Sequence, residues 1–340
     1  MKTFYITIFA CFLTSFSFSQ NTDSSQYYFN KGVEENAAKL YSVASQNFEK
    51  AIQINPDYME AYIANGKANL AMRRVSQATQ NFEEAYKIDQ GNKEVIKELS
   101  SLYFSNRQFQ KAIELAQKCT GCDNADRILG MSNYNLEDYG KAEKYLKQAI
   151  ALNTQDAEAA YTLGRTYLEL ENEKSAITFY EKAIDADTSR SAWMYELGLI
   201  YYNQNDYKNS LKYFDRAAEK GYTKSNDFYE NYGFAQLYYG DTGNGLKTLN
   251  TVLERKPNNK ELLNNIANAM YDTRKYEEAL GYFKTLLDLN PKDATSLYMA
   301  GMTFQKLGQK EKGQKICDNA IAMDPSLAKY RQKKEMPAGL

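Results

Sequence analysis

The sequence predicts an all-α protein built as a solenoid, in which helical hairpins of similar length stack one after another. Three observations support this fold class. Similar groups of residues recur 34 positions apart, apolar residues recur at helical spacing within each group, and no linker rich in proline or glycine divides the 340 residues. A fixed period of about 20–50 residues is typical of repeat architectures, in which each unit buries its apolar face against its neighbours.

Each repeat carries a small residue in its first half, then a small, a larger and a small residue in its second half. Gly66 follows Gly32 by 34 residues, and Ala78 follows Ala44 by the same distance. The frame returns nine times, with the second-half residues Ala44, Phe48, Ala51; Ala78, Phe82, Ala85; Ala112, Ala116, Cys119; Ala142, Leu146, Ala149; Ala176, Tyr180, Ala183; Ser210, Phe214, Ala217; Gly245, Leu249, Val252; Ala279, Phe283, Leu286; and Gly313, Cys317, Ala320. Pro56, Pro257, Pro291 and Pro325 fall between units at one phase.

A single unit, "MYELGLIYYNQNDYKNSLKYFDRA", predicts two helices. Apolar residues recur at helical spacing on both sides of the turn "NQND". Small residues such as Gly198 and Ala217 let the two helices approach closely. We expect most tyrosines to be scaffold, and predict core positions for Tyr167, Tyr180, Tyr201, Tyr207 and Tyr276.

This pattern resembles the tetratricopeptide repeat family, whose unit is a helix–turn–helix of 34 residues. The resemblance covers residues 25–325 as nine units and implies a right-handed superhelix. The third unit is shortened, because Ala142 follows Ala112 by only 30 residues. Residues 326–340 then predict a polar capping helix with a tail, since a solenoid needs a solvated last helix.

The resemblance also implies that the first helix of each unit faces a concave groove. The positions that contact ligands in this family hold mostly aromatic, amide and arginine side chains in the middle and C-terminal units. The candidate groove residues are Arg127, Tyr134, Tyr161, Arg165, Tyr195, Tyr202, Phe234, Tyr238, Asn264, Asn268, Tyr271 and Tyr298, with Asn203 and Asp272 presented beside them.

These residue types suit a peptide ligand. Tyrosine and phenylalanine give contact area at low entropic cost, and asparagine both donates to and accepts from a main chain. Arg127 and Arg165 are suited to carboxylates. We therefore hypothesise that the groove binds an extended or helical segment of another protein; the alternative is that several of these tyrosines pack on neighbouring helices.

The first two units hold Phe29, Val33, Ile63 and Lys67 at the positions that matter for one subtype of the family. Chaperone-binding members use a clamp of lysine and asparagine there to hold a C-terminal carboxylate. The first unit lacks that clamp, so chaperone-tail binding is not expected.

The composition disfavours several function classes. Lysine plus arginine number 42 and aspartate plus glutamate 43, a balance without the basic footprint of a nucleic-acid binder. The chain has no histidine, which removes the commonest general base and a common zinc ligand. No nucleophile motif is recognisable and 20–340 leave no room for a catalytic domain, so we expect neither an enzyme, nor a cofactor, nor a metal site.

The N-terminus, "MKTFYITIFACFLTSFSFSQN", predicts a secretory signal peptide over residues 1–19, followed by a short segment at 20–24. Lys2 supplies the positive region, an apolar stretch follows, and Ser17 and Ser19 are small residues before the cut. The alternatives are a short membrane anchor or lipidation at Cys11. The apolar stretch is shorter than the ~18 residues of a spanning helix, so we expect an exported protein, periplasmic or on the periplasmic side of an outer membrane, without a membrane span in the mature chain.

The spacing of Cys119 and Cys122 is one that redox enzymes and zinc sites use. Zinc would need two further ligands, which the chain does not offer nearby. A helix C-terminus also disfavours the thiolate of a redox cysteine. In an oxidising compartment, residues three apart at a helix end come within disulfide reach. We predict a local disulfide at the shortened junction; two free buried thiols or a redox pair are the alternatives.

Three function classes follow. The leading one is a non-catalytic protein-interaction scaffold or adaptor of the cell envelope, set in an envelope complex and binding a peptide segment or protein in its groove. The alternative is a glycan-binding solenoid for peptidoglycan or exported polysaccharide, because tyrosine faces and asparagine amides also suit sugar rings. An enzyme is the third class and has no motif in its favour.

Overall fold

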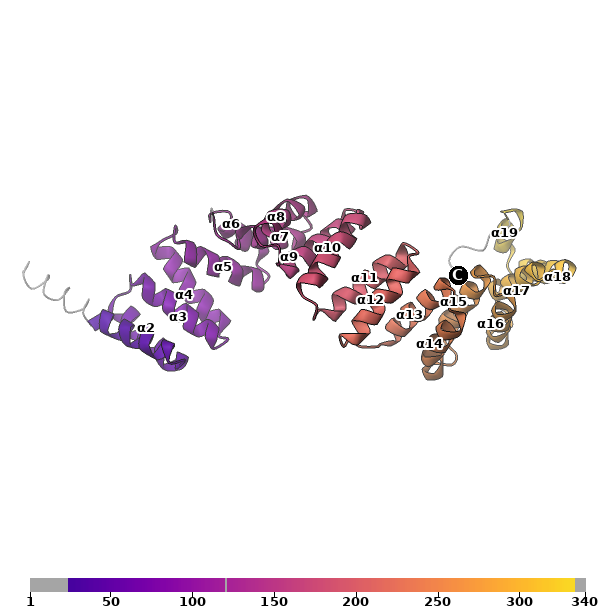
Figure 1. The fold of residues 1–340 in the computed structure, drawn as a ribbon, viewed down its shortest axis with the longest axis horizontal. Helices are drawn as coiled ribbons and strands as arrows, with labels where there is room; N and C mark the ends of the chain where they lie inside the picture. The colour runs from indigo at the N-terminus through magenta and orange to yellow at the C-terminus, as the bar shows by residue number, and fades with distance from the viewer. Residues whose placement is uncertain (1–23, 120, 334–340) are drawn as a thin grey trace, which may run out of the picture. The chain divides into compact units, whose positions relative to one another are not determined.

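The computed structural model describes residues 24–119 and 121–333. In those residues every regular element is a helix, and the predicted all-α solenoid is confirmed. The predicted signal peptide at 1–19 and the end of the predicted tail lie outside the described residues. The chain divides into two compact units, Met1–Ala186 and Asp187–Leu340, and Figure 1 shows the helices of each following one another in chain order.

The first unit consists of hairpins in which each helix contacts the next. Residues 24–37 are helical, and Phe29 among them packs against Ala44 and Phe48 of the next helix. The remaining helices are α2 (Tyr41–Ile54), α3 (Met59–Ala71), α4 (Val75–Ile88), α5 (Lys93–Ser105), α6 (Phe109–Ala116), α7 (Ala125–Asn135), α8 (Tyr139–Leu152), α9 (Ala157–Glu169) and α10 (Glu173–Ala186).

The second unit has four more hairpins and a short terminal segment. Its helices are α11 (Ser191–Asn203), α12 (Tyr207–Glu219), α13 (Asn226–Tyr239), α14 (Thr242–Arg255), α15 (Lys260–Asp272), α16 (Tyr276–Leu289), α17 (Ala294–Lys306), α18 (Lys310–Met323), the 3₁₀ turn η1 (Pro325–Leu327) and α19 (Ala328–Lys333). Leu327 and Tyr330 pack against Tyr298 and Cys317, so this terminal segment covers the apolar end of the last hairpin.

The turn inside every described hairpin has one left-handed residue. Seven of these residues are not glycine, and their φ angles lie between 54° and 63°. They are Lys39, Arg73, Arg107, Glu137, Glu171, Asn205 and Arg274, and Gly240 and Gly308 take the same place in two further turns. After each such residue a backbone N–H donates to a carbonyl five residues earlier, as Arg74 does to Asn69 over 2.8 Å. This pattern closes the end of the first helix.

Polar residues between helices begin many of the helices that follow. Asp138 accepts a hydrogen bond from the backbone N–H of Lys141, and Asp206 accepts one from Asn209. Such side chains satisfy the N–H groups that a helix start leaves unpaired. Turns and caps thus recur with the repeat, which explains why hairpins of similar construction form.

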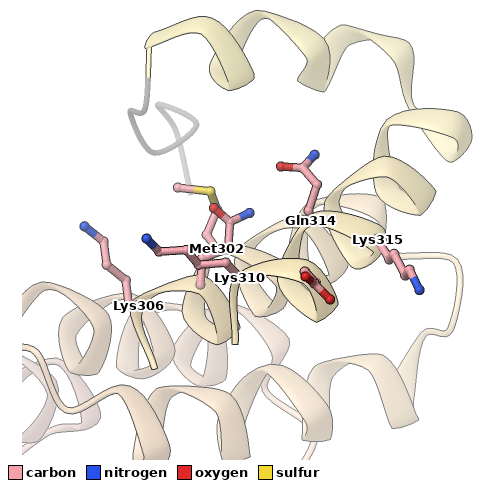
Figure 2. A pocket seen from close by; sticks show the side chains of 7 residues that line it. Met302, Lys306, Lys310, Gln314 and Lys315 are labelled. Carbon is pink, nitrogen blue, oxygen red and sulfur yellow. The ribbon is translucent and has the colours of Figure 1, made fainter. Parts of the chain in front are cut away.

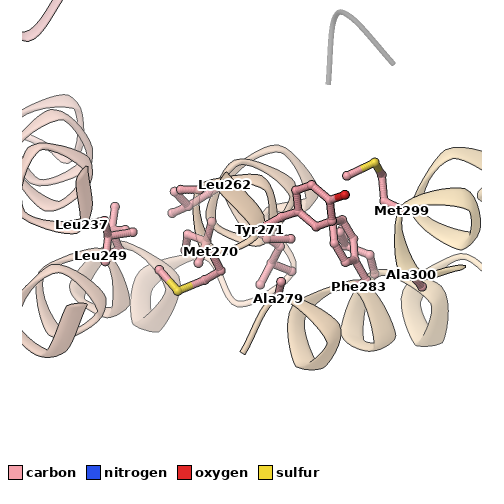
Figure 3. Packing of buried hydrophobic residues seen from close by; sticks show 14 of the residues in the cluster. Leu237, Leu249, Leu262, Met270, Tyr271, Ala279, Phe283, Met299 and Ala300 are labelled. Atoms are coloured by element: carbon pink, nitrogen blue, oxygen red, sulfur yellow. The ribbon is translucent and has the colours of Figure 1, made fainter. Parts of the chain in front are cut away.

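The two helices of a hairpin pack through the small residues of the repeat. A Cβ atom added at Gly198 would lie 2.6 Å from the Phe214 ring. A buried cluster of the second unit, shown in Figure 3, joins α13 to α17 and includes Met270, Phe283 and Met299. Each hairpin therefore completes the core of the next one, as stacking requires.

The first helices of neighbouring hairpins contact one another: α5 contacts α7, α7 contacts α9, and α13 contacts α15. They form one face in each unit, which we call the first-helix face. The predicted contact positions lie on these helices.

The third hairpin is the short one. Its second helix, α6, has 8 residues, whereas α4 and α8 have 14 each. In the structure a disulfide joins Cys119, which is buried, to Cys122, with Cα atoms 5.5 Å apart. The bridge lies just beyond α6, where longer second helices continue, and Leu152 of the next hairpin is 70% exposed nearby.

We expect alkylation of the unfolded, unreduced mature protein to label Cys317 and to leave Cys119 and Cys122 unlabelled. Cys317 is the internal control, because it is a free thiol. In the folded protein it is buried and burial raises its pKa to about 11, so unfolding is needed to label it. Reduction should make all three thiols reactive. Mass spectrometry of the labelled peptides gives the answer, and labelling of the pair without reduction would contradict the disulfide.

No helix within 24–119 and 121–333 is both long and apolar enough to cross a membrane.

Candidate functional site on the first-helix face

Arg127 was predicted to bind a partner's carboxylate, but it already has one in the structure. Its Nε lies 3.0 Å from Oδ2 of Asp156. The same carboxylate accepts a hydrogen bond from the N–H of Ala159 and begins α9. Arg127 therefore connects two hairpins of the first unit, and its proposed role as a carboxylate ligand is not supported.

Arg165 lies against two aromatic rings of the first unit. Its guanidinium carbon is 5.3 Å from the centre of the Tyr134 ring and 5.8 Å from that of Tyr161. Arg165 is exposed, while both tyrosines are half-buried. Contacts of this kind are worth about 0.5–1 kcal/mol at exposed sites. The structure brings these three predicted residues together as one stack of a cation and two rings.

Three predicted groove tyrosines of the second unit are core residues instead. Tyr298 is 1% exposed, Tyr271 is 8% exposed and Tyr195 is 9% exposed. Their positions on the first helices are as expected, but each ring turns between helices and packs there; Figure 3 shows Tyr271 within the core cluster. The prediction that these three rings contact a ligand at the surface is therefore wrong. They pack on neighbouring helices, which was the alternative.

Tyr195 shows how such a ring is held. It stacks on Tyr222 with ring centres 4.4 Å apart, and Nδ2 of Asn231 donates a hydrogen bond of 2.7 Å to its hydroxyl. Burial raises the pKa of this phenol. Both ends of the side chain are thus occupied by the protein itself.

Tyr202, Phe234, Tyr238 and Asn264 are the predicted residues of the second unit that stay half-buried on the face. Tyr202 and Tyr238 meet a third ring, Tyr207, which begins α12. Tyr207 was predicted as core, and its half-buried position beside the two groove tyrosines corrects this. Repeat position did not select Tyr207 as a face residue, because Tyr207 lies outside the first helix of its hairpin.

Asn268 on α15 has an unusual environment. It is 7% exposed, and neither Oδ1 nor Nδ2 has a hydrogen-bond partner among the described residues. It follows Ala267 as Arg165 follows Gly164 and Phe234 follows Gly233. Those two residues reach the surface of the face, whereas both amide atoms of Asn268 are buried beneath it.

Asp272 ends α15 near the tyrosine group and is exposed. Although the residue is exposed, desolvation by the protein around its carboxyl raises the pKa of Asp272. Burial, and next the charge of Asp272, raise the pKa of Tyr238 to about 12, and the same two causes raise the pKa of Tyr207. The carboxylate is therefore close enough to act on both phenols.

A depression at the end of the second unit was not predicted. It is lined by Met302, Gln305, Lys306, Lys310, Glu311, Gln314 and Lys315 of α17 and α18. In Figure 2 the side chains of Lys306 and Lys310 extend on one side, and Lys315 points away from them. Lys306 occupies the repeat position that Asp272 has in the preceding hairpin, so the face changes from negative to positive charge there.

The part of the chain that the structure describes contains no group of three or more cysteine, aspartate or glutamate side chains arranged to hold a metal ion.

Family models described as "Tetratricopeptide repeat" match residues 136–193, 180–225, 260–293 and 294–327. The chain is similar to the solved structure "MamA MSR-1 C2" at 21% identity over 48% of this chain and 97% of that one, with a TM-score of 0.43. It is similar to YrrB, described as "a TPR protein with an unusual peptide-binding site", at 24% identity over 55% and 97%, with a TM-score of 0.41. The chain is also similar to the TPR domain of P58(IPK), at 13% identity over 91% of this chain and 97% of that one, with a TM-score of 0.30. No curated protein matches the chain.

Proposed function

Because this chain belongs to the tetratricopeptide repeat family, a class of protein-interaction scaffolds, we propose that its second unit binds an extended segment of a partner protein on the first-helix face. The observation that carries the proposal is the unpartnered amide of Asn268. We propose further that the chain acts as a non-catalytic scaffold.

A buried amide without partners is costly for the free protein. Leaving one buried polar group unsatisfied costs about 1–3 kcal/mol. Asn268 has an unpaired donor and an unpaired acceptor together. Both atoms are buried in the free protein, so neighbouring side chains must move aside before a partner can reach them. A peptide group offers the complementary pair, and a partner's main chain bound there would satisfy both and recover that free energy.

The side chains around this amide fit the same ligand. Tyr202, Phe234 and Tyr238 supply half-buried rings on the neighbouring helices of the face, and Asn264 lies one helical turn before Asn268. Rings with a polar tip give contact area at low entropic cost. Main-chain hydrogen bonds with aromatic contacts suit an extended segment of loosely defined sequence.

We propose an exported location, periplasmic or on the periplasmic side of an outer membrane, and a role in an envelope complex. This rests on the N-terminal sequence, with Lys2, the apolar stretch after it, and small residues at Ser17 and Ser19. Fractionation of source cells, with N-terminal sequencing of the mature chain, tests it. A mature chain in the cytoplasm that retains Met1–Ser19 would refute it.

Asn268→Leu should stabilise the free protein and weaken binding at the same time. Replacing an unsatisfied amide by an apolar side chain of similar size removes the desolvation cost, so we expect a gain of about 1 kcal/mol. Binding should weaken at least tenfold, which is about 1.4 kcal/mol. The probes are peptides selected from a displayed random library on the wild-type chain, with affinities measured by fluorescence anisotropy and Tm by calorimetry.

Asn250→Leu is the matched control, because Asn250 is an exposed asparagine on the second helix α14. It should change neither the affinity nor Tm appreciably. Two results oppose the proposal: no peptide is selected at all, or Asn268→Leu binds the selected peptides as the wild type does. Selective protection of the face from hydrogen exchange by soluble peptidoglycan fragments would point to a glycan ligand instead.

A further inference from the structure

Three tyrosines of the second unit contact one another on the first-helix face, and Asp272 ends the helix α15 of the next hairpin. The Tyr207 and Tyr238 rings stack, with centres 5.2 Å apart and planes inclined by 19°. Tyr202 lies edge-on to both rings, 5.6 Å from Tyr207 and 6.4 Å from Tyr238. The charge of Asp272 acts on both rings of the stacked pair, after burial, to raise the pKa of each phenol. We call these four residues the Tyr–Asp cluster.

The Tyr–Asp cluster contains a carboxylate, and no cation is paired with that carboxylate among the described residues. Among the described residues, no ion pair or hydrogen bond joins the Asp272 side chain to another group, and Lys306, its equivalent in the next hairpin, is not paired with it. Asp272 is exposed, and desolvation by the protein around it raises the pKa of its carboxyl. The Tyr207 hydroxyl donates to Oδ1 of Asn205 over 2.6 Å, so its O–H group is already engaged.

The first unit contains a related arrangement in which the cation is present. Tyr134 lies four residues after Gly130, as Tyr202 lies four residues after Gly198. The next hairpin supplies Arg165, whose guanidinium lies against Tyr134 at 5.3 Å. In the second unit the equivalent residue of the next hairpin is Phe234. The same repeat position thus provides a cation for Tyr134 and none for Tyr202.

We propose that the Tyr–Asp cluster is a binding site for a cationic side chain of the partner segment, a guanidinium or an ammonium group. Aromatic faces attract cations through their quadrupole, and a carboxylate adds a charge-assisted contact. An acidic side chain would meet Asp272 and be repelled. The inference rests on the proposed function, because it names the chemistry of one residue of the segment bound on this face.

The test uses a minimal probe, acetyl-arginine methylamide, with acetyl-citrulline methylamide as the neutral control of the same shape. The full chain carries 3-fluorotyrosine, and single Tyr→Phe variants assign the fluorine signals of Tyr202, Tyr207 and Tyr238. We expect the arginine probe to shift these signals with saturation in the millimolar range, and the citrulline probe to leave them unchanged. Salt should weaken the effect, because the carboxylate is partly exposed.

Asp272→Asn should weaken binding of the arginine probe at least fivefold, whereas Asp288→Asn, a change at an exposed carboxylate of α16, should not alter it. A second variant, Phe234→Arg, places a cation where the first unit has Arg165, and it should abolish binding of the probe. Circular dichroism and Tm establish that each variant is folded. If Phe234→Arg does not fold, the effect of Asp272→Asn alone tests the cationic site.

The inference is overturned if both probes shift the signals equally, if neither does, or if Asp272→Asn binds as the wild type does. Its failure is distinguishable from failure of the proposed function. Library peptides that bind in an Asn268-dependent way but contain no excess of arginine or lysine would refute the cationic site and leave peptide binding in place.

Discussion

Phe283→Ala is expected to destabilise the second unit by about 3–5 kcal/mol, the usual cost of truncating a buried phenylalanine. Phe283 is fully buried in the cluster that joins α13 to α17, near Tyr271 and Met299 (Figure 3). Its removal leaves a cavity between hairpins that a regular stack cannot close. Urea unfolding of the full chain, together with hydrogen exchange resolved by segment, measures the loss in α15, α16 and α17.

Phe283→Leu is the matched control, because Leu146 and Leu249 occupy the same repeat position and are fully buried. It should cost clearly less than the alanine variant. Equal losses for both variants, or a loss below about 1 kcal/mol for Phe283→Ala, would contradict the packing argument. In a solenoid the effect should decline with distance from the altered hairpin.

Gly313→Ala is expected to destabilise the last hairpin by about 2–3 kcal/mol through overpacking. A Cβ atom there would collide with the carbonyl oxygen of Gly301 and lie 2.9 Å from the backbone nitrogen of Gln305. Two backbones cannot give way as a flexible side chain can, so α17 and α18 must separate. Hydrogen exchange should therefore accelerate in α17, α18 and α19 and remain slow in α11 to α14.

Gly281→Ala is the same chemical change, but we expect it to raise the stability of the protein where Gly313→Ala lowers it. A Cβ atom at Gly281 meets nothing within 4 Å, and the residue lies inside α16. Alanine should stabilise the protein there by about 0.5–1 kcal/mol, because glycine is the weaker helix former. The idea of a backbone contact at Gly313 fails if both variants shift Tm in the same direction.

The candidate site was partly predictable. Repeat position alone placed Tyr202, Phe234 and Tyr238 on the first helices, and the structure leaves them half-buried on that face. The same rule also selected Tyr298, which is buried. Repeat position defines the helix that bears a side chain, but the rotamer and the residue of the next hairpin decide whether the ring packs inward or stays at the surface.

Tyr207 shows a second limit. Tyr207 begins a second helix, and its stacking on Tyr238 joins residues 31 positions apart in different hairpins. The packing of one hairpin on the next sets such a pairing, and a period found along the chain carries no information on it. The amide of Asn268 was selected by position, while its lack of partners is a property of the folded core.

The sequence by itself determined the class of fold, because a 34-residue period of small and apolar residues is compatible only with hairpins that bury their faces by stacking. It also determined the shortened third repeat, which is a matter of counting residues. Only the tertiary structure decided which face residues are available to a partner. Arg165 meets two rings in the first unit, whereas Phe234 in the second brings no charge to Tyr202, and that difference between neighbouring hairpins arises from contacts across the stack.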